Sequence, residues 1–256
     1  MTEPVETLIA YTNNFYAVER TLRFFQASFW TASLIGAEGY QAKATHSKAQ
    51  IHLARRFLRT FKWVDCWTNI FLGPRSEYGA VHENVQMLRD STLGMYFFLD
   101  MLVLPSALGA MDESWLSFFV EDMSGVKGVG IGPLEHTAGV CWFYAILLSI
   151  VLGALELVTT PAKKPEKAAA KRKPEKGTST AVEKKAATEP PSTTGKATPT
   201  IVRELITNSL DIIIPATGVG YLSLDPVYVS IAMAASSLIT MNAIWSRIYA
   251  DFERSS

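Results

Sequence analysis

The sequence contains little of what stabilises secreted proteins or builds β-sheets. Only two of its 256 residues are cysteines, Cys66 and Cys141, and they lie far apart, so no disulfide framework is expected. No Asn-x-Ser/Thr sequon occurs, and residues 1–6 carry two glutamates in place of a basic head, so no secretory signal is expected. Period-two alternation bounded by turn residues is also missing. These absences favour an all-α protein in a reducing, cytosol-facing setting.

Patterns typical of catalysis, metal binding or nucleic-acid binding are equally scarce. His82–Glu83 and Glu135–His136 are adjacent pairs, whereas a helical metal site needs ligands about four residues apart. The glycine-rich run 125–133 follows no predicted strand and lacks the spacing of a phosphate-binding loop, so it is interpreted as a flexible entry to the next helix. No aromatic platform accompanies the basic residues. We therefore expect no catalytic residue, no metal, no cofactor and no nucleic-acid partner.

Two long uncharged stretches are what the sequence does contain. Residues 137–155 run 19 positions without a charge, and residues 226–246 run 21. At about 1.5 Å per residue, each helix would reach roughly 30 Å, the thickness of the hydrocarbon core of a bilayer. We predict a transmembrane helix over 137–158. The second stretch, diluted by Ser, Thr and Asn, is predicted as a second transmembrane helix over 226–246, or as a helix packed against protein or lying shallow in the membrane.

The first 136 residues have the periodicity of cytosol-facing or interfacial helices. Apolar residues three and four apart, from Leu8 to Phe29, predict one long helix that ends near Gly36 and Gly39. The same spacing predicts a second helix from about Thr45 or Ser47 to beyond Trp67, and a third over 81–104. The fold class is therefore an all-α integral membrane protein with amphipathic helices and one or two transmembrane helices.

The composition changes abruptly over residues 159–200. This stretch has nine Lys, one Arg and four Glu, a net charge of +6, and it has no aromatic residue. Such a segment cannot bury a core, so we predict a disordered basic linker. Helix is expected to resume in a C-terminal hydrophobic region over 201–256, with a break near Pro215 and Gly218.

A basic amphipathic helix is predicted over residues 47–64. Residues 43–62 contain six Lys or Arg and no acid, and helical spacing puts the cations opposite an aromatic and aliphatic face. That pattern is typical of a helix lying in an anionic membrane surface, with its apolar face in the acyl boundary and its cations on lipid phosphates. The alternative is a helix that packs Phe57 and Phe61 into a soluble core. The predicted lipid-binding residues are Lys48, Ile51, Ala54, Arg55, Arg56, Phe57, Leu58, Arg59, Phe61, Lys62 and Val64.

Single residues within the apolar helices add two further hypotheses. Asp100 lies in an apolar run, where a carboxylate is costly unless paired, so we expect it to pair with a buried basic residue or to lie between subunits. Small residues recur every fourth position within both predicted spans, which favours close helix packing or oligomer contacts, although such residues are common in any membrane helix. They are Ala145, Ser149, Gly153, Ala232, Ser236 and Thr240.

Four segments, in this order, resemble the peroxin-11 family of peroxisomal membrane proteins, which elongate and proliferate the organelle. VERTLRFFQ (18–26) is similar to the arginine-rich first helix of the family, with Arg20, Leu22, Arg23 and Gln26 in matching places. The segment around 55–62 resembles its lipid-inserting helix, and MYFFLDMLVLP (95–105) resembles its aromatic and aspartate-containing helix. LDIIIPATGVGYLSL followed by ASSLITMNAIW (210–245) resembles its last hydrophobic region. The basic insert has no counterpart in the family, which indicates a divergent, fungal-type member.

The resemblance implies a non-enzymatic membrane-remodelling factor integral to the peroxisomal membrane. It also implies cytosol-facing ends, homo-oligomers, and recruitment of fission factors including a dynamin-type GTPase. With two spans the linker would face away from both ends, whereas its positive charge favours the cytosol. Two other functions compete: a pore for small metabolites built around Asp100 and Asp211, and a lipid-modifying enzyme, which the lack of a His or acid cluster disfavours.

Overall fold

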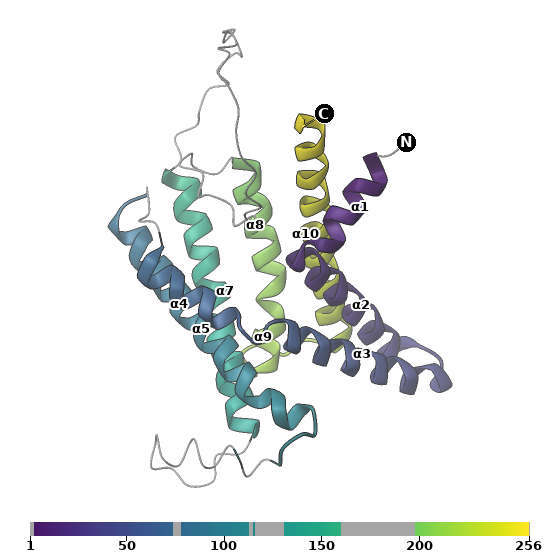
Figure 1. Ribbon diagram of the computed structural model, residues 1–256. Coiled ribbons are helices and arrows are strands. Elements are labelled where there is room, and N and C mark those ends of the chain that lie inside the picture. Colours follow the sequence, from purple (N-terminus) through teal and green to yellow (C-terminus); the bar gives the residue numbers. More distant parts are fainter. Residues whose placement is uncertain (1–2, 74–77, 113–114, 116–130, 160–197, 256) are drawn as a thin grey trace, which may run out of the picture.

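The structure, a computed structural model, arranges long helices side by side with both termini at one end (Figure 1). It describes residues 3–73, 78–112, 115, 131–159 and 198–255. No strand occurs among these residues, which confirms the all-α fold. Most of the predicted linker and most of the glycine-rich run lie outside the described residues. The helices are α1 (Glu3–Asn13), α2 (Phe15–Ile35), α3 (Glu38–Leu58), α4 (Lys62–Leu72), α5 (Ala80–Ala107), α7 (Ile131–Thr159), α8 (Thr198–Asp211), α9 (Ile213–Gly218) and α10 (Pro226–Ser255).

The single helix predicted from Leu8 to near Gly36 is two helices, because Asn14 interrupts it, although the predicted end is confirmed. The backbone of Asn14 is extended, and its side-chain oxygen accepts a hydrogen bond from the amide of Ala17 at 3.1 Å. This is the geometry of a helix N-cap, in which the side chain satisfies an amide that the first turn leaves unpaired. α2 is therefore a separate helix from α1, and it runs from Phe15 to Ile35.

The predicted helix from Thr45 or Ser47 to beyond Trp67 is also wrong in its bounds. α3 begins earlier, at Glu38, and ends at Leu58, where the amide of Arg59 donates to the carbonyls of Arg55 and Arg56. α4 starts again at Lys62. The span 47–64 is thus a helix end, a turn over 59–61 and a helix start. α2 and α3 pack against each other as an antiparallel pair (Figure 1).

α5 and α7 form the most extensive helix pair of the fold. Tyr96 of α5 stacks on Trp142 of α7, with ring centroids 5.4 Å apart and an interplanar angle of 14°. Gly94 lets α4 approach α5, because a Cβ there would lie 2.6 Å from the indole nitrogen of Trp67. The third predicted helix, over 81–104, is confirmed as α5, although it continues through Pro105 to Ala107.

Two helices are long and apolar enough to cross a membrane among the described residues. They are Gly132–Thr159, with a mean hydropathy of 2.2, and Pro226–Arg254, with a mean hydropathy of 1.6. α8 and α9 run back along α7 between them, so the chain passes along the bundle three times in this part (Figure 1). As a result, Thr159, Thr198 and both termini lie at the same end of the bundle (Figure 1). The side of the membrane that the linker and the termini face stays a prediction.

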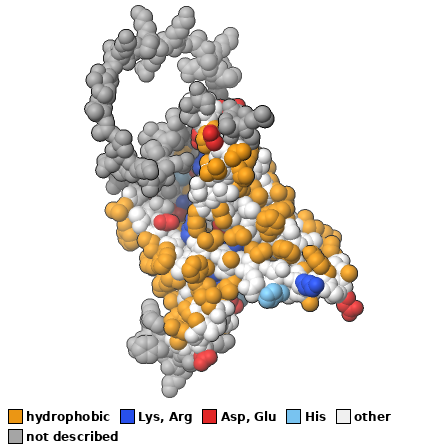
Figure 2. Space-filling model, turned by 45° about the vertical axis from the view of Figure 1, so that its right-hand side comes forward, with side chains coloured by type: hydrophobic (Ala, Val, Ile, Leu, Met, Phe, Trp, Pro, Cys, Tyr) orange, Lys and Arg blue, Asp and Glu red, His pale blue; other side chains and the backbone are white. Residues whose placement is uncertain are grey.

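The distribution of polarity differs from that of a typical water-soluble protein. Large apolar side chains are exposed along the length of the molecule, including Leu8, Phe71, Val158 and Ile231, and hydrophobic side chains spread over the face seen in Figure 2. Buried positions, in contrast, include many charged and polar side chains. They are Glu19, Arg23, Gln26, Arg55, Arg59, His82, Asp90, Asp100, Glu156, Asp211, Ser230, Ser236 and Ser237. Such an arrangement suits a lipid surrounding, in which polar groups must be satisfied inside the protein.

Candidate functional site

Arg55 joins α3 to α2 inside the bundle. Its Nε and Nη2 donate to Oε1 of Glu19 at 2.9 and 2.6 Å, and its Nη1 donates to Oε1 of Gln26 at 2.5 Å. Glu19 and Gln26 are seven residues apart, so they lie on the same face of α2, two turns from each other. The three side chains are all buried. This contact therefore fixes the register of α3 against α2.

Arg55 and Glu19 are the first centre of a buried network of charged side chains, and Asp100 of α5 is the second. Arg56 places Nε 2.9 Å from its Oδ1, and Nη2 of Arg59 donates to its Oδ2 at 3.3 Å. Arg56 also reaches Glu135 of α7 at 2.9 Å, and the guanidinium of Arg59 lies 5.8 Å from the ring centre of Tyr96. Of the two expectations for Asp100, the buried partner of a basic residue is confirmed.

Asp211 at the end of α8 is the third centre. Arg23 donates to both of its carboxylate oxygens, from Nη1 at 2.9 Å and from Nη2 at 2.6 Å, a bidentate geometry. Arg20, one turn earlier, is farther away, with Nη1 at 3.6 Å from Asp211 and Nε at 3.7 Å from Glu19. Because 188 residues separate Arg23 from Asp211, this pair ties the N-terminal helices to the C-terminal region.

The close packing of these charges shifts several pKa values. Burial alone would raise the pKa of Glu19, but Arg55 and Arg20 lower it to about 2. Burial together with Arg56 lowers the pKa of His52, on the same side of α3, to about 3. Burial lowers the pKa of Arg55 to about 10, and Glu19 opposes that shift. At neutral pH Glu19 and Arg55 are therefore both charged, and His52 is uncharged beside them.

The arginines predicted to meet lipid phosphates point inward instead. Arg55 is 6% exposed and Arg59 is 9% exposed, whereas Phe57 is 66% exposed and Phe61 is 73% exposed. The apolar residues Ala54 and Val64 are exposed as well, and Ile51, Leu58 and Arg56 are half-buried. The sequence grouped the two faces of α3 correctly, but their orientation is the reverse of a basic outer surface. Lipid binding by this segment stays a prediction.

The two lysines of the predicted lipid-binding set lie at the edges of this segment. The ammonium of Lys48 lies 4.3 Å from the ring centre of Trp30, and that of Lys62 lies 5.3 Å from the ring centre of Phe15. Both contacts have the geometry of cation–π interactions. Neither lysine therefore continues an outward basic face.

The small residues of the two apolar helices pack within the chain. Gly153 of α7 is buried against α8, where an added Cβ would lie 2.8 Å from Leu205. Ala145 and Ala232 are buried, as is Ser236, whose hydroxyl donates to the carbonyl of Met233 at 3.1 Å. Ser149 and Thr240 are half-buried. Helix packing is thus their role in one chain, and their use in oligomers stays a prediction.

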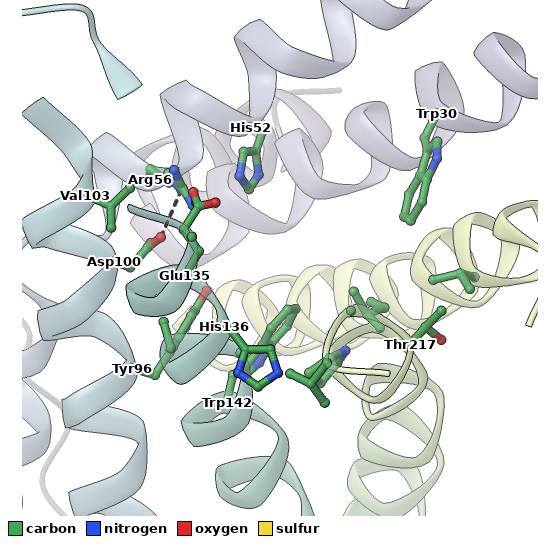
Figure 3. Close-up of a pocket in the computed structure, with 18 of the residues that line it drawn as sticks. Trp30, His52, Arg56, Tyr96, Asp100, Val103, Glu135, His136, Trp142 and Thr217 are labelled. Atoms are coloured by element: carbon green, nitrogen blue, oxygen red, sulfur yellow. Dashed lines mark hydrogen bonds and ion pairs between the residues drawn. The ribbon is translucent and has the colours of Figure 1, made fainter. Parts of the chain in front are cut away.

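Two cavities flank the stacked pair Tyr96 and Trp142, and both residues line each cavity. The larger, of about 580 Å³, is lined mainly by apolar groups, with Arg56 and Asp100 at its polar side. Figure 3 shows His52, Glu135 and His136 around it as well. The smaller, of about 440 Å³, holds most of the charges of the network. The described residues contain no group of three His, Cys, Asp or Glu side chains that could hold a metal ion.

Comparison with known proteins gives one match. The family model of peroxisomal biogenesis factor 11 (PEX11) matches residues 5–245. The chain belongs to the PEX11 family. No curated protein and no solved structure gives a significant match. Membership in this family identifies a factor of peroxisome biogenesis that is associated with the peroxisomal membrane.

All four segments that carry the PEX11 resemblance meet in the buried network. Arg23 and Gln26 come from the first segment, Asp100 from the third and Asp211 from the last. The second segment supplies Arg55, Arg56 and Arg59. The sequence reasoning gave Glu19 no role, and it considered Glu135 only as part of an adjacent pair with His136. A signal for Glu19 was present, because Glu19, Arg23 and Gln26 recur at spacings of four and three on one helical face.

Proposed function

We propose that this chain is an integral protein of the peroxisomal membrane that promotes curvature, elongation and division of the organelle. The observation that carries the proposal is the distribution of polarity in the fold: buried charges are paired inside, and large apolar side chains are exposed along the outside. A protein with this surface gains free energy by burying it in lipid, at about 25 cal/mol per Å² of apolar area. Family membership supplies the organelle.

The part that bends the membrane is proposed to be the aromatic ridge, defined as Phe57 of α3, Phe61 of the turn that follows, and Val64, Phe71 and Leu72 of α4. All five side chains are exposed. α3 lies across the long helices α7 and α10 instead of along them (Figure 1). A helix lying across the bundle can enter one leaflet from the side and expand it. The arginines behind the ridge hold it in place and contact protein instead of phosphate.

The orientation follows from the charge of the segment between α7 and α8. Residues 160–197 carry nine Lys and one Arg against four Glu. Lys- and Arg-rich loops of this length favour the cytosolic side of a membrane. Since Thr159 of α7 and Thr198 of α8 lie at the same end of the bundle as both termini, we propose that the termini and this segment all face the cytosol (Figure 1). This arrangement removes the conflict between the charge of the linker and the cytosol-facing ends.

Self-association and recruitment of a dynamin-type fission GTPase complete the proposal. Both rest on family membership. The exposed apolar residues of α10, such as Tyr228, Ile231 and Leu238, provide a helix face on which a second copy can pack. Cross-linking of single cysteines introduced at these positions tests the association directly, and the absence of cross-linked dimers in native membranes argues against it.

The central experiment separates the ridge from the network. Phe57→Glu with Phe61→Glu changes two exposed side chains, so the protein is expected to accumulate and reach peroxisomes but to leave them round instead of elongated. The matched control is Thr45→Glu with Ala49→Glu, two exposed positions of the same helix outside the ridge. Microscopy of elongated organelles gives the readout. Normal elongation by the Phe→Glu protein would overturn the proposed role of the ridge.

A pore for small polar solutes is the second candidate, and the paired cavities favour it. The two cavities meet at Tyr96 and Trp142, so movement of this aromatic pair would join them inside the bundle. Conductance of the purified protein in planar bilayers, with altered ion selectivity after Asp100→Asn, would support this function. No conductance at any protein concentration would exclude it.

A further inference from the structure

The smaller cavity has an excess of positive charge that its own acids do not neutralise. Six cationic and four anionic side chains line it, a difference of two positive charges. The cations are Arg20, Arg23, Arg55, Arg59, Lys62 and Arg89. The four carboxylates are those of Glu19, Asp65, Asp90 and Asp211.

Most of the cations are already bound. Arg23 makes a bidentate pair with Asp211, Arg55 is held by Glu19, and Arg89 donates to Asp90 at 2.6 and 2.8 Å. Arg59 uses one nitrogen on Asp100, at 3.3 Å, outside the lining of this cavity. The lining charges left over are those of Arg20 and Lys62 against the carboxylate of Asp65, an excess of one positive charge.

Arg20 has donors without hydrogen bonds. Only its Nη2 donates, to the hydroxyl of Tyr16 at 2.8 Å, while Nε and Nη1 are buried and make no hydrogen bond to any described residue. The nearest carboxylate oxygens lie at 3.6 and 3.7 Å. The Nε of Arg59 is buried and unbonded in the same way. Buried guanidinium donors left without partners cost free energy, which an anionic ligand would recover.

Lys62 completes the arrangement at the start of α4. It lies against the ring of Phe15 and forms no ion pair with any described residue. Its ammonium and the first amides of α4 both favour a negative charge nearby. The same cavity has an apolar side built from Leu93, Phe97 and Ile146. Its volume of about 440 Å³ leaves room for a phosphate group and a short attached portion of a larger molecule.

We propose that this cavity binds a phosphate-bearing anion, with Arg20 and Lys62 as its principal ligands. Phosphate matches the planar fork of an arginine and the point charge of a lysine, and one phosphate group carries the charge needed to balance the excess. The group can belong to the headgroup of an anionic phospholipid or to a soluble phosphate compound. The inference does not depend on membrane remodelling, because it concerns a ligand inside the bundle.

The test uses the full-length protein purified in a neutral detergent. Thermal unfolding is followed while inorganic phosphate, dihexanoyl phosphatidic acid or dihexanoyl phosphatidylcholine is added, since a ligand that binds only the folded state raises Tm. We expect phosphatidic acid to raise Tm and phosphatidylcholine to leave it unchanged. A response to inorganic phosphate as well would identify a site open to soluble phosphate, and a response to phosphatidic acid alone would identify a lipid headgroup site.

Two lysine variants test whether binding in this cavity causes the rise in Tm. Lys62→Met should weaken binding about tenfold or more, because it removes a charge-assisted contact. Lys48→Met removes a lysine of the same helix pair that also rests on an aromatic ring but does not line the cavity, and it should bind like the unchanged protein. A Tm without ligand equal to that of the unchanged protein shows that each variant folds. Equal binding by both variants, or no rise in Tm with either phosphate compound, would overturn the proposal.

Discussion

The two faces of the segment 51–64 differ in a way that its sequence does not reveal. One face holds Arg55 and Arg59, which are buried in ion pairs, and the other holds Phe57 and Phe61, which are exposed. In water, the same helix would bury its phenylalanines and expose its arginines. The choice between the two orientations depends on carboxylates that lie far away in the sequence, at Glu19 and Asp100.

The comparison teaches that the amphipathicity of a helix defines which residues share a face, but not which face is inside. Within a lipid surrounding, arginines are stable only if protein acids or water satisfy them, whereas phenylalanines can contact acyl chains directly. The inner face therefore determines the assembly of the helices. The outer face is free to act on the membrane. Substitutions on the inner face should therefore change stability more than substitutions on the outer face.

Removing a positive charge from the inner face, at Arg55, should cause the largest loss of stability. Arg55→Met leaves the carboxylate of Glu19 buried without its main partner, which costs about 3–5 kcal/mol. We expect a Tm many degrees lower in detergent, together with poor accumulation in cells. The loss should be smaller in the double variant Arg55→Met with Glu19→Met, because removing both members of a buried pair leaves no unpaired charge.

A double-mutant cycle measures the interaction energy between Arg55 and Glu19. The free energies of unfolding of the two single variants, the double variant and the unchanged protein yield a coupling energy. A large favourable coupling is expected from the bonds of 2.6 and 2.9 Å between the two side chains. Strictly additive losses would show that the pair does not hold α2 and α3 together.

Lowering the pH should first reduce the stability of the folded protein through His52, at pH values above those at which Glu19 is protonated. Burial and the neighbouring Arg56, Arg59, Arg55 and Lys48 lower the pKa of His52 from 6.5 to about 3. The unfolded chain therefore binds a proton that the folded chain does not, so stability is complete above pH 6.5 and falls as the pH drops towards 3. Between pH 6.5 and 5 the loss is up to about 2 kcal/mol.

The variants that check this effect are His52→Asn and His46→Asn. His52→Asn should flatten the decline of Tm between pH 7.5 and 5, whereas His46→Asn, at an exposed position of the same helix, should not. Glu19, whose pKa is lowered to about 2, contributes to the decline only below its ordinary value of 4.5. An identical pH profile for the unchanged protein and His52→Asn would disprove the role of His52.

Local pattern alone predicted the all-α fold, the two apolar helices and the grouping of residues on α3. It did not predict the inward orientation of Arg55, because that depends on Glu19 and Gln26 of another helix. The break at Asn14 was missed because the apolar spacing of three and four continues through it. The position of α8 between α7 and α10 was missed as well, because α8 has low hydrophobicity and its one deeply buried acid is neutralised by the distant Arg23.

Substitutions on the outer face should cause the smallest change in stability. Phe57→Ser with Phe61→Ser alters side chains that are 66% and 73% exposed, so the free energy of unfolding in detergent should change by about 0.5 kcal/mol or less. The matched control is Val103→Ser, at a position that is 1% exposed, where the loss of buried apolar contacts and the unpaired hydroxyl should cost several times as much. Thermal unfolding of the three proteins at pH 7.5 makes the measurement. If the double Ser variant lost as much stability as Val103→Ser, the phenylalanines would have to pack inside the protein, and they could not form a membrane-facing ridge. A small loss combined with failed elongation in cells would separate the membrane contact of the outer face from the assembly of the inner one.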